Sequence, residues 1–144
     1  MVNSQCSGIY KKCLNIKITN ACPGSCYFCI ERYGYKPNMA PVTQIVEKAN
    51  TLEDYQTVLI LGGEPFTYPH LLELLQGLRK KEIYVTTNGG SFTNADIPSM
   101  SKYITGLNIS IHSYDESENS AILKTKVDFH ALKEAIACFQ SYGV

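Results

Sequence analysis

Apolar residues along the chain form short strand-like runs, and between these runs they recur at helical spacing. Residues 13–19 alternate apolar and polar positions and carry β-branched side chains, which predicts a strand. In residues 57–61 a threonine is followed by four apolar residues in a row, as expected of a parallel strand that is covered on both faces. Residues 82–87 and 106–111 predict a third and a fourth strand.

Between these runs the apolar residues recur at helical spacing. Pro41 and Thr43 are start signals for the first of these stretches, and Asp128 could cap the last, which Gly143 ends. Pro98 lies inside the third stretch and weakens it as a helix. The four expected helices span residues 44–52, 69–81, 95–103 and 129–142.

Strands and helices alternating four times predict an α/β fold with a parallel sheet and right-handed crossovers. A closed barrel of eight such units takes about 250 residues, so 144 residues give room for about four units. We expect an N-terminal extension over residues 1–12 and one core domain over residues 13–144. The next strand would begin near Val144, so the chain is a fragment or its open sheet edge is covered by a partner.

Composition narrows the classes of function. Thirteen Lys plus Arg balance thirteen Asp plus Glu, so the charge gives no sign of binding to nucleic acid or to an anionic membrane. No apolar run reaches the roughly 18 residues of a spanning helix, and the first residues lack the apolar centre of a signal peptide. The sequence therefore predicts a cytoplasmic protein, in which cysteines serve metal binding or catalysis more often than disulfides.

Three of the six cysteines stand close together in the sequence. Cys22, Cys26 and Cys29 have the spacing C-x3-C-x2-C and follow the first predicted strand, at the edge where parallel α/β folds bind ligands. Three thiolates can bind zinc or an iron–sulfur cluster, but a structural zinc site needs a fourth ligand and none is near in sequence. The other cysteines, Cys6, Cys13 and Cys138, are interpreted as ordinary thiols.

With the aromatic Phe28 before the third cysteine, this motif resembles the C-x3-C-x-φ-C motif of the radical S-adenosylmethionine (SAM) family. The resemblance implies that Cys22, Cys26 and Cys29 hold three irons of a [4Fe–4S] cluster, and that Phe28 lies beside the SAM adenine. It also implies an incomplete version of the family's partial (β/α)6 TIM-type barrel, because only four of six units are matched. The matched region covers about residues 13–144.

Further polar residues follow the other strands. Gly62-Gly63-Glu64-Pro65 could be a simple turn, but together with the cysteines it resembles the family's GGE motif, which implies that Gly62, Gly63 and Glu64 contact the SAM amino group. By the same resemblance Thr87, Asn88 and Ser110 could approach the SAM ribose or carboxylate, although such residues also form turns. His112 is interpreted as a strand-end histidine, and the loop 31–37 as a solvated connector.

The resemblance implies an enzyme that cleaves SAM reductively and uses a 5′-deoxyadenosyl radical to take hydrogen from a substrate. Its partners would be a reductant such as flavodoxin or ferredoxin, a substrate that the sequence does not identify, and a second copy or another chain at the open sheet edge. Three alternatives stay open. They are a zinc-binding module, an electron-transfer iron–sulfur protein, and a truncated member of the family that keeps a cluster as an interaction module but does not cleave SAM.

Overall fold

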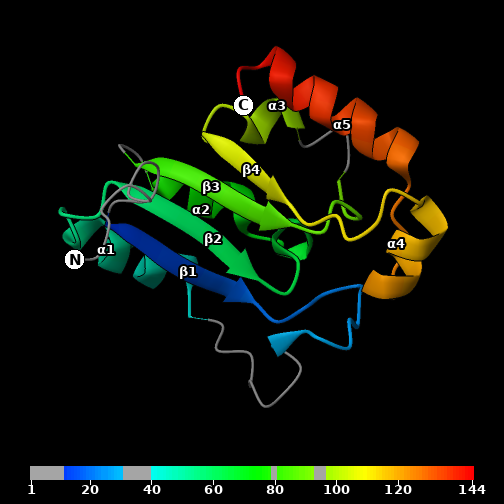
Figure 1. Ribbon diagram of the computed structural model, residues 1–144. Helices are drawn as coiled ribbons and strands as arrows, with labels where there is room; N and C mark the ends of the chain where they lie inside the picture. The colour runs from blue at the N-terminus through cyan, green and yellow to red at the C-terminus, as the bar shows by residue number, and fades with distance from the viewer. Residues whose placement is uncertain (1–11, 31–39, 79–80, 93–96) are drawn as a thin grey trace, which may run out of the picture.

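Four parallel strands form one sheet in the computed structural model of the chain, which describes residues 12–30, 40–78, 81–92 and 97–144. The sheet order is β1-β2-β3-β4, so each strand lies beside the next one in sequence (Figure 1). The four strands are β1 Cys13–Thr19, β2 Thr57–Gly62, β3 Glu82–Thr87 and β4 Gly106–Ile109. The predicted α/β class, with parallel strands and an open sheet, is confirmed.

Some predicted features lie outside the described residues. They are most of the N-terminal extension with Cys6, the connector 31–37, residues 79–80 of the second predicted helix and residues 95–96 of the third.

The two faces of the sheet differ in composition. Val58 pairs with Ile83, and Ile60 with Val85, and all four side chains are at most 2% exposed beneath the helices. Burial of each such side chain contributes about 2 kcal/mol. The residues between them in sequence face the other side, where positions such as Lys17 stay partly exposed. The core therefore lies between the sheet and the helices, and the second face is open and mixed in polarity.

Strand β4 is shorter than the run 106–111 that the sequence predicted. The amide of Ser110 still donates to the Thr87 oxygen at 2.9 Å, but the His112 amide donates to Asn119 Oδ1 at 2.8 Å. That side-chain acceptor replaces a strand partner, and the chain turns away from the sheet.

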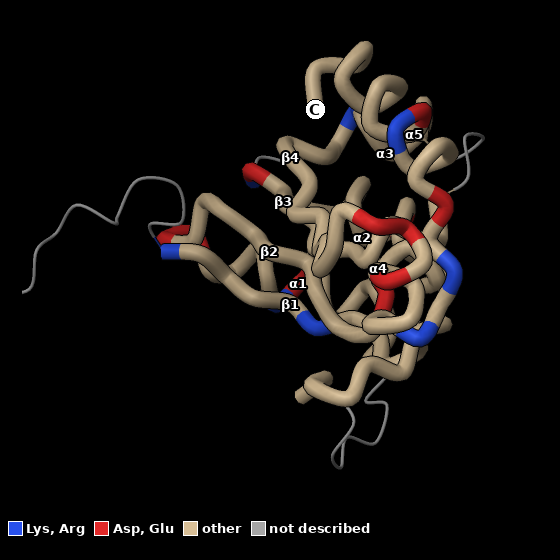
Figure 2. Tube along the Cα trace, turned by 45° about the vertical axis from the view of Figure 1, so that its right-hand side comes forward, with Lys and Arg blue, Asp and Glu red and all other residues tan. Residues whose placement is uncertain are grey.

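Helices α1, α2 and α3 connect successive strands, and α4 and α5 follow β4 (Figure 1). None of the helices in the described ranges is long and apolar enough to cross a membrane. Charged positions of both signs are interspersed along the described trace, as the balanced composition led us to expect (Figure 2). The helices are α1 Val42–Thr51, the short 3-10 helix η3 Pro65–Thr67, α2 Leu71–Gly77, α3 Ile97–Met100, α4 Glu116–Leu123 and α5 Phe129–Ser141.

Helix α2 corrects the predicted span 69–81, because it begins at Leu71 and ends at Gly77. The apolar spacing continues to Leu78, yet this buried residue already lies beyond the last helical turn. A Cβ on Gly77 would stand 2.5 Å from the Val46 side chain, so this glycine lets α1 and α2 approach closely. In α3, Pro98 lies in the first described turn, where a missing amide costs no helical hydrogen bond.

Helix α4 is a helix that the sequence prediction missed. Its sequence is polar, and only Asn119 and Leu123 are buried, so it lacks the apolar stripe on which the prediction depended. Its N-terminal signal was nevertheless present. Asp115 accepts from the Glu118 amide at 2.7 Å, in the spacing that marks a helix N-cap.

Helix α5 begins where the sequence predicted and ends at Ser141, one residue before the predicted end. The Asp128 carboxylate accepts from the amides of His130 and Ala131 at 2.9 and 3.0 Å, and thereby caps the helix. Beyond the last turn, Gly143 has a φ of 86°, a conformation that glycine adopts without strain.

Candidate functional site

The three clustered cysteines lie in the loop that leaves the carboxyl end of β1. Cys22 is exposed and Cys26 and Cys29 are partly buried, and the Cys29 amide donates to the Cys26 oxygen at 3.2 Å. Within the described ranges, no three His, Cys, Asp or Glu side chains are grouped closely enough to hold a metal ion. The sequence placed these residues at the correct edge of the sheet.

The C-terminal end of α4 holds this loop in place. The Ser25 amide donates to the Leu123 oxygen at 3.2 Å, and the Cys26 thiol donates to the same oxygen at 3.4 Å. A Cβ on Gly24 would stand only 2.6 Å from that oxygen, so a glycine is needed for this approach. Figure 1 shows α4 beyond the carboxyl ends of the strands, next to the segment that carries the cysteines.

Cys22 differs from Cys26 because its sulfur accepts hydrogen bonds. The Gly24 amide donates to Cys22 Sγ at 3.4 Å, and Asn88 Nδ2 donates to it at 3.6 Å. Partial burial of the Cys22 thiol is the main cause that raises its pKa, although the residue as a whole is exposed. The charges of Glu64 and of the other two cysteines raise it further by smaller amounts. The Gly24 amide acts in the opposite direction because it stabilises the thiolate.

Gly62, the last residue of β2, and Gly63 after it bring the end of this strand against the cysteine loop. A Cβ on Gly62 would stand 2.3 Å from the Thr19 oxygen, and a Cβ on Gly63 would stand 2.3 Å from the Ala21 oxygen. The Gly63 amide donates to Thr19 at 2.7 Å. The close approach that these glycines allow is therefore to the protein's own backbone, and their contact with SAM remains a prediction.

Glu64 is completely buried, with 0% of its surface exposed. Its Oε1 accepts from Thr87 Oγ1 at 2.8 Å and from the Phe66 amide at 3.1 Å, and its Oε2 accepts from the Asn88 amide at 2.7 Å. Burial raises the pKa of this carboxyl group, and the three donors oppose that effect. Glu64 therefore joins the ends of β2 and β3 from inside the protein.

Two of the other predicted contacts with SAM also have partners within the protein. Thr87 is 2% exposed, and its hydroxyl accepts from the Gly89 amide at 3.0 Å while it donates to Glu64. Ser110 is partly buried at the end of β4, beside Thr87. Their expected roles toward SAM are not tested by these contacts.

Phe28 and His112 come together from distant parts of the sequence. Their ring centroids are 4.9 Å apart with an interplanar angle of 53°, and the ring of Tyr27 lies 5.1 Å from that of Phe28. Phe28 is 44% exposed, so part of its ring is open to a ligand. The parallel topology placed both residues at the carboxyl edge of the sheet, but nothing in the sequence indicated that their rings are in contact.

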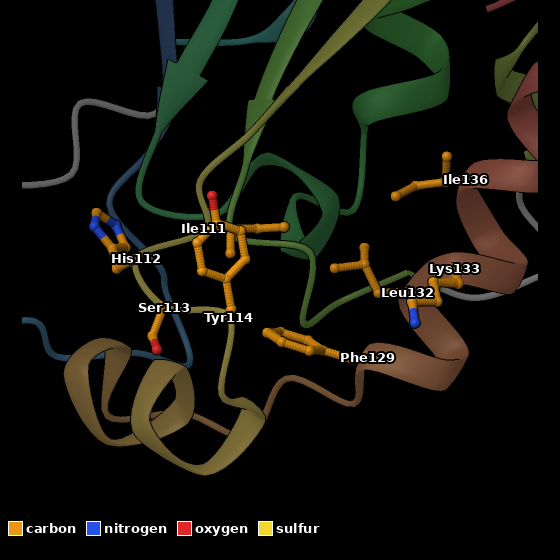
Figure 3. Close-up of a pocket in the computed structure, with 8 residues that line it drawn as sticks. All are labelled: Ile111, His112, Ser113, Tyr114, Phe129, Leu132, Lys133 and Ile136. Atoms are coloured by element: carbon orange, nitrogen blue, oxygen red, sulfur yellow. The ribbon is translucent and has the colours of Figure 1, made fainter.

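A pocket of about 880 Å³ lies between the segment after β4, which includes His112, and the start of α5. Figure 3 shows Ile111 and Tyr114 from that segment opposite Phe129 and Leu132 from the start of α5. Lys133 adds a cation to its lining. The pocket is mainly apolar and adjoins the predicted site.

The donor set is consistent with an iron–sulfur cluster. Of the remaining cysteines that the structure describes, Cys13 lies on β1 and Cys138 on α5, so the loop offers three thiolates. Three thiolates leave one iron of a cubane cluster open, whereas a closed zinc site requires four ligands. The two N–H donors at Cys22 suit a ligand that becomes a thiolate.

Comparisons with known proteins relate this chain to one enzyme superfamily. The family model described as the radical SAM superfamily matches residues 16–144. A probable GTP 3′,8-cyclase from Methanocaldococcus jannaschii is 34% identical over 53% of this chain and 28% of its own length. Molybdenum cofactor biosynthesis protein 1 from Bos taurus is 26% identical over 90% of this chain and 22% of its own. This chain thus spans less than a third of either relative.

Solved structures have the same fold. Streptococcus suis SuiB bound to its precursor peptide SuiA superposes with a TM-score of 0.76 at 22% identity, covering 93% of this chain and 31% of that one. Methylornithine synthase (PylB) gives a TM-score of 0.71 at 21% identity, covering 91% and 42% of the two chains. At these identities the likeness concerns the fold alone.

Proposed function

This chain belongs to the radical SAM superfamily, and from that premise we propose that Cys22, Cys26 and Cys29 bind three irons of a [4Fe–4S] cluster whose fourth iron binds SAM. These cysteines would hold the cluster, which would supply the electron for reductive cleavage of SAM and so for radical abstraction of hydrogen from a substrate. The electron would come from a small reductant protein such as flavodoxin or ferredoxin.

The residues of the chain position the ligands and exclude water. The cysteine loop supplies the thiolates, and the exposed part of the Phe28 ring offers an apolar surface against which the adenine can lie. Backbone around Gly62 and Gly63, together with Asn88 and Ser110, would meet the polar groups of SAM. Glu64 and Thr87 are both buried, so they would hold these residues in position from inside the protein.

One observation carries this proposal. The three cysteines share one loop at the carboxyl edge of a parallel sheet, and the Cys22 sulfur accepts two N–H donors there. Hydrogen bonds to a ligand sulfur are a regular feature of iron–sulfur sites.

Anaerobic reconstitution with iron and sulfide, followed by EPR of the reduced protein with and without SAM, tests the proposal. We expect a cubane signal that changes when SAM is added, and its loss in Cys26→Ala. The matched control is Cys138→Ala, because Cys138 lies on α5 away from the loop and its removal should leave the signal unchanged.

The other outcomes separate the alternatives. A colourless protein that binds zinc through the same loop would contradict the cluster. A cluster whose signal ignores SAM would contradict the enzyme and favour an interaction module that no longer cleaves SAM.

The substrate is proposed from the curated relatives. Because two archaeal relatives of 34% and 31% identity are named probable GTP 3′,8-cyclases, we propose a purine nucleotide and would test GTP first. Equilibrium binding of GTP to the reconstituted protein, with CTP as the control, measures this preference. Equal binding of both nucleotides would contradict it and leave the apolar pocket beside His112 as the guide to a different substrate.

A further inference from the structure

We propose that Asn88 tunes the cluster through an N–H···S hydrogen bond to Cys22, and that the buried Glu64 is the positioning residue that aims Asn88 at this sulfur. The inference rests on the proposed function, because it requires the cluster. It gives Glu64 and Asn88 roles that do not depend on contact with SAM.

The carboxamide of Asn88 is held at both of its polar atoms. Its Oδ1 accepts from the Gly90 amide at 2.8 Å, and its Nδ2 lies 3.6 Å from Cys22 Sγ. Of the two ends of the carboxamide only the oxygen can accept from the Gly90 amide, so this contact fixes which end is Nδ2. The Nδ2 end of the Asn88 carboxamide therefore points at Cys22 Sγ.

The backbone of Asn88 is fixed by Glu64. Oε2 of this carboxylate accepts the Asn88 amide at 2.7 Å, and Oε1 is itself held by Thr87 and Phe66. With 0% of its surface exposed, Glu64 has no water to exchange these donors with. The end of β3 is thereby tied to the turn after β2, in the position from which Asn88 reaches Cys22.

An N–H donor at a ligand sulfur changes the reduction potential of a cluster. Reduction adds negative charge, part of which lies on the sulfurs, and a donor stabilises that charge. Asn88 and the Gly24 amide both donate to Cys22, so both favour the reduced state. Asn88 is the one of the two that a substitution can remove without altering the cysteine loop.

The experiment measures the midpoint potential of the reconstituted cluster by EPR-monitored redox titration without SAM. Leaving SAM out separates an effect on the sulfur from any contact between Asn88 and SAM. Asn88→Ala removes the donor but keeps the backbone amide that Glu64 holds, and we expect a shift to lower potential. Asn50→Ala, an exposed asparagine on α1, is the matched control and should leave the potential unchanged.

Two variants test the positioning role. Glu64→Gln keeps the size of the side chain but places an amide in a group of donors, and Thr87→Val removes one donor that anchors the carboxylate. Thr87→Val leaves the charge of Glu64 in place and should shift the potential in the same direction as Asn88→Ala, by a smaller amount. Glu64→Gln also removes a negative charge that acts on Cys22, which raises the potential, so its test is that Asn88→Ala has a smaller effect in the Glu64→Gln background than in the wild type. Thr87→Val answers the question even where Glu64→Gln does not fold.

Iron and sulfide contents are determined first, so that failure of the proposed function can be distinguished from failure of the roles of Asn88 and Glu64. A wild-type protein that takes up no cluster would contradict the proposed function. A wild-type cluster with an unchanged potential in Asn88→Ala would overturn the role of Asn88. An unchanged potential in Thr87→Val, or an undiminished effect of Asn88→Ala in the Glu64→Gln background, would overturn that of Glu64.

Discussion

Buried polar side chains organise the carboxyl edge of the sheet, and Glu64 is the central one. The motif Gly62–Pro65 could be recognised in the sequence, but its partners could not, because Thr87 and Asn88 come from the next strand along. Likewise the sequence suggested that the glycines face a ligand, whereas their missing side chains make room for the backbone of Thr19 and Ala21. A motif identifies the residue types and leaves open which neighbour they serve.

Replacing Glu64 by alanine should destabilise the protein strongly. The Thr87 hydroxyl and the amides of Phe66 and Asn88 would lose their acceptor in a buried place, at a total cost of about 3 kcal/mol or more. Urea denaturation of the two proteins measures the difference. Glu47→Ala, at an exposed site on α1, should change the free energy of unfolding by less than about 0.5 kcal/mol. Similar losses in both variants would show that the hydrogen bonds of Glu64 do not matter for stability.

Among the elements, a periodic apolar pattern predicted that a strand or helix exists, but not always where it begins or ends. Strands β1 and β3 have the predicted bounds, and α5 has its predicted N-cap. Helix α4 was missed because its sequence is polar, and the end of α2 was misplaced because Leu78 continues the apolar spacing beyond the helix. The Asp115 cap was the overlooked signal.

Weakening α4 should loosen the cysteine loop, because Leu123 at its end accepts from the Ser25 amide, a bond that does not depend on a protonated cysteine. Asp115→Ala removes the N-cap at a cost of about 1 kcal/mol. We expect the reconstituted variant to release iron to a chelator faster than the wild type. Asp115→Ser restores a capping oxygen and should restore the slow release; equally fast release from it would mean that the cap is not the cause.

The cap of α5 should make stability depend on pH. The amides of Ala131 and His130 lower the pKa of Asp128 in the folded protein, with Ala131 the larger cause. A carboxyl group with a lowered folded pKa stabilises the fold above its unfolded pKa and loses that effect as the pH falls through the folded value. The wild type should therefore lose melting temperature on acidification more steeply than Asp128→Asn, whose amide oxygen caps at every pH. Parallel thermal melts between pH 7 and pH 3 compare the two, and identical slopes would contradict the assignment.

For the molecule as a whole, the length of the chain predicted an open sheet, but the sequence did not predict which apolar side chains are exposed along its carboxyl edge. Among the described strands, β1 and β4 each pair on one side only. Large apolar side chains are exposed along the carboxyl rim, namely Tyr27, Phe28, Ile30, Ile111 and Tyr114. Such a rim and an unpaired edge favour a covering partner.

We expect a second copy of the chain to cover this edge. The mass in solution, measured by sedimentation equilibrium over a range of concentrations, should then approach twice 16.0 kDa. Lys substituted for Ile109 on β4 should shift the equilibrium toward single chains, because edge lysines oppose strand pairing. A mass of one chain at all concentrations would remove the idea of a dimer.

The bond between the cysteine loop and α4 also has a consequence for synthesis of the protein. Cys26 and Leu123 are 97 residues apart, so the cysteines leave the ribosome well before the carbonyl that holds their loop. At the usual rate of translation that interval lasts about 5 to 20 s. During it the nascent chain carries three thiols on a loop that lacks this anchor. Metal delivered in that time would meet an unformed site, so a cluster bound by this loop would be inserted after translation has passed Leu123.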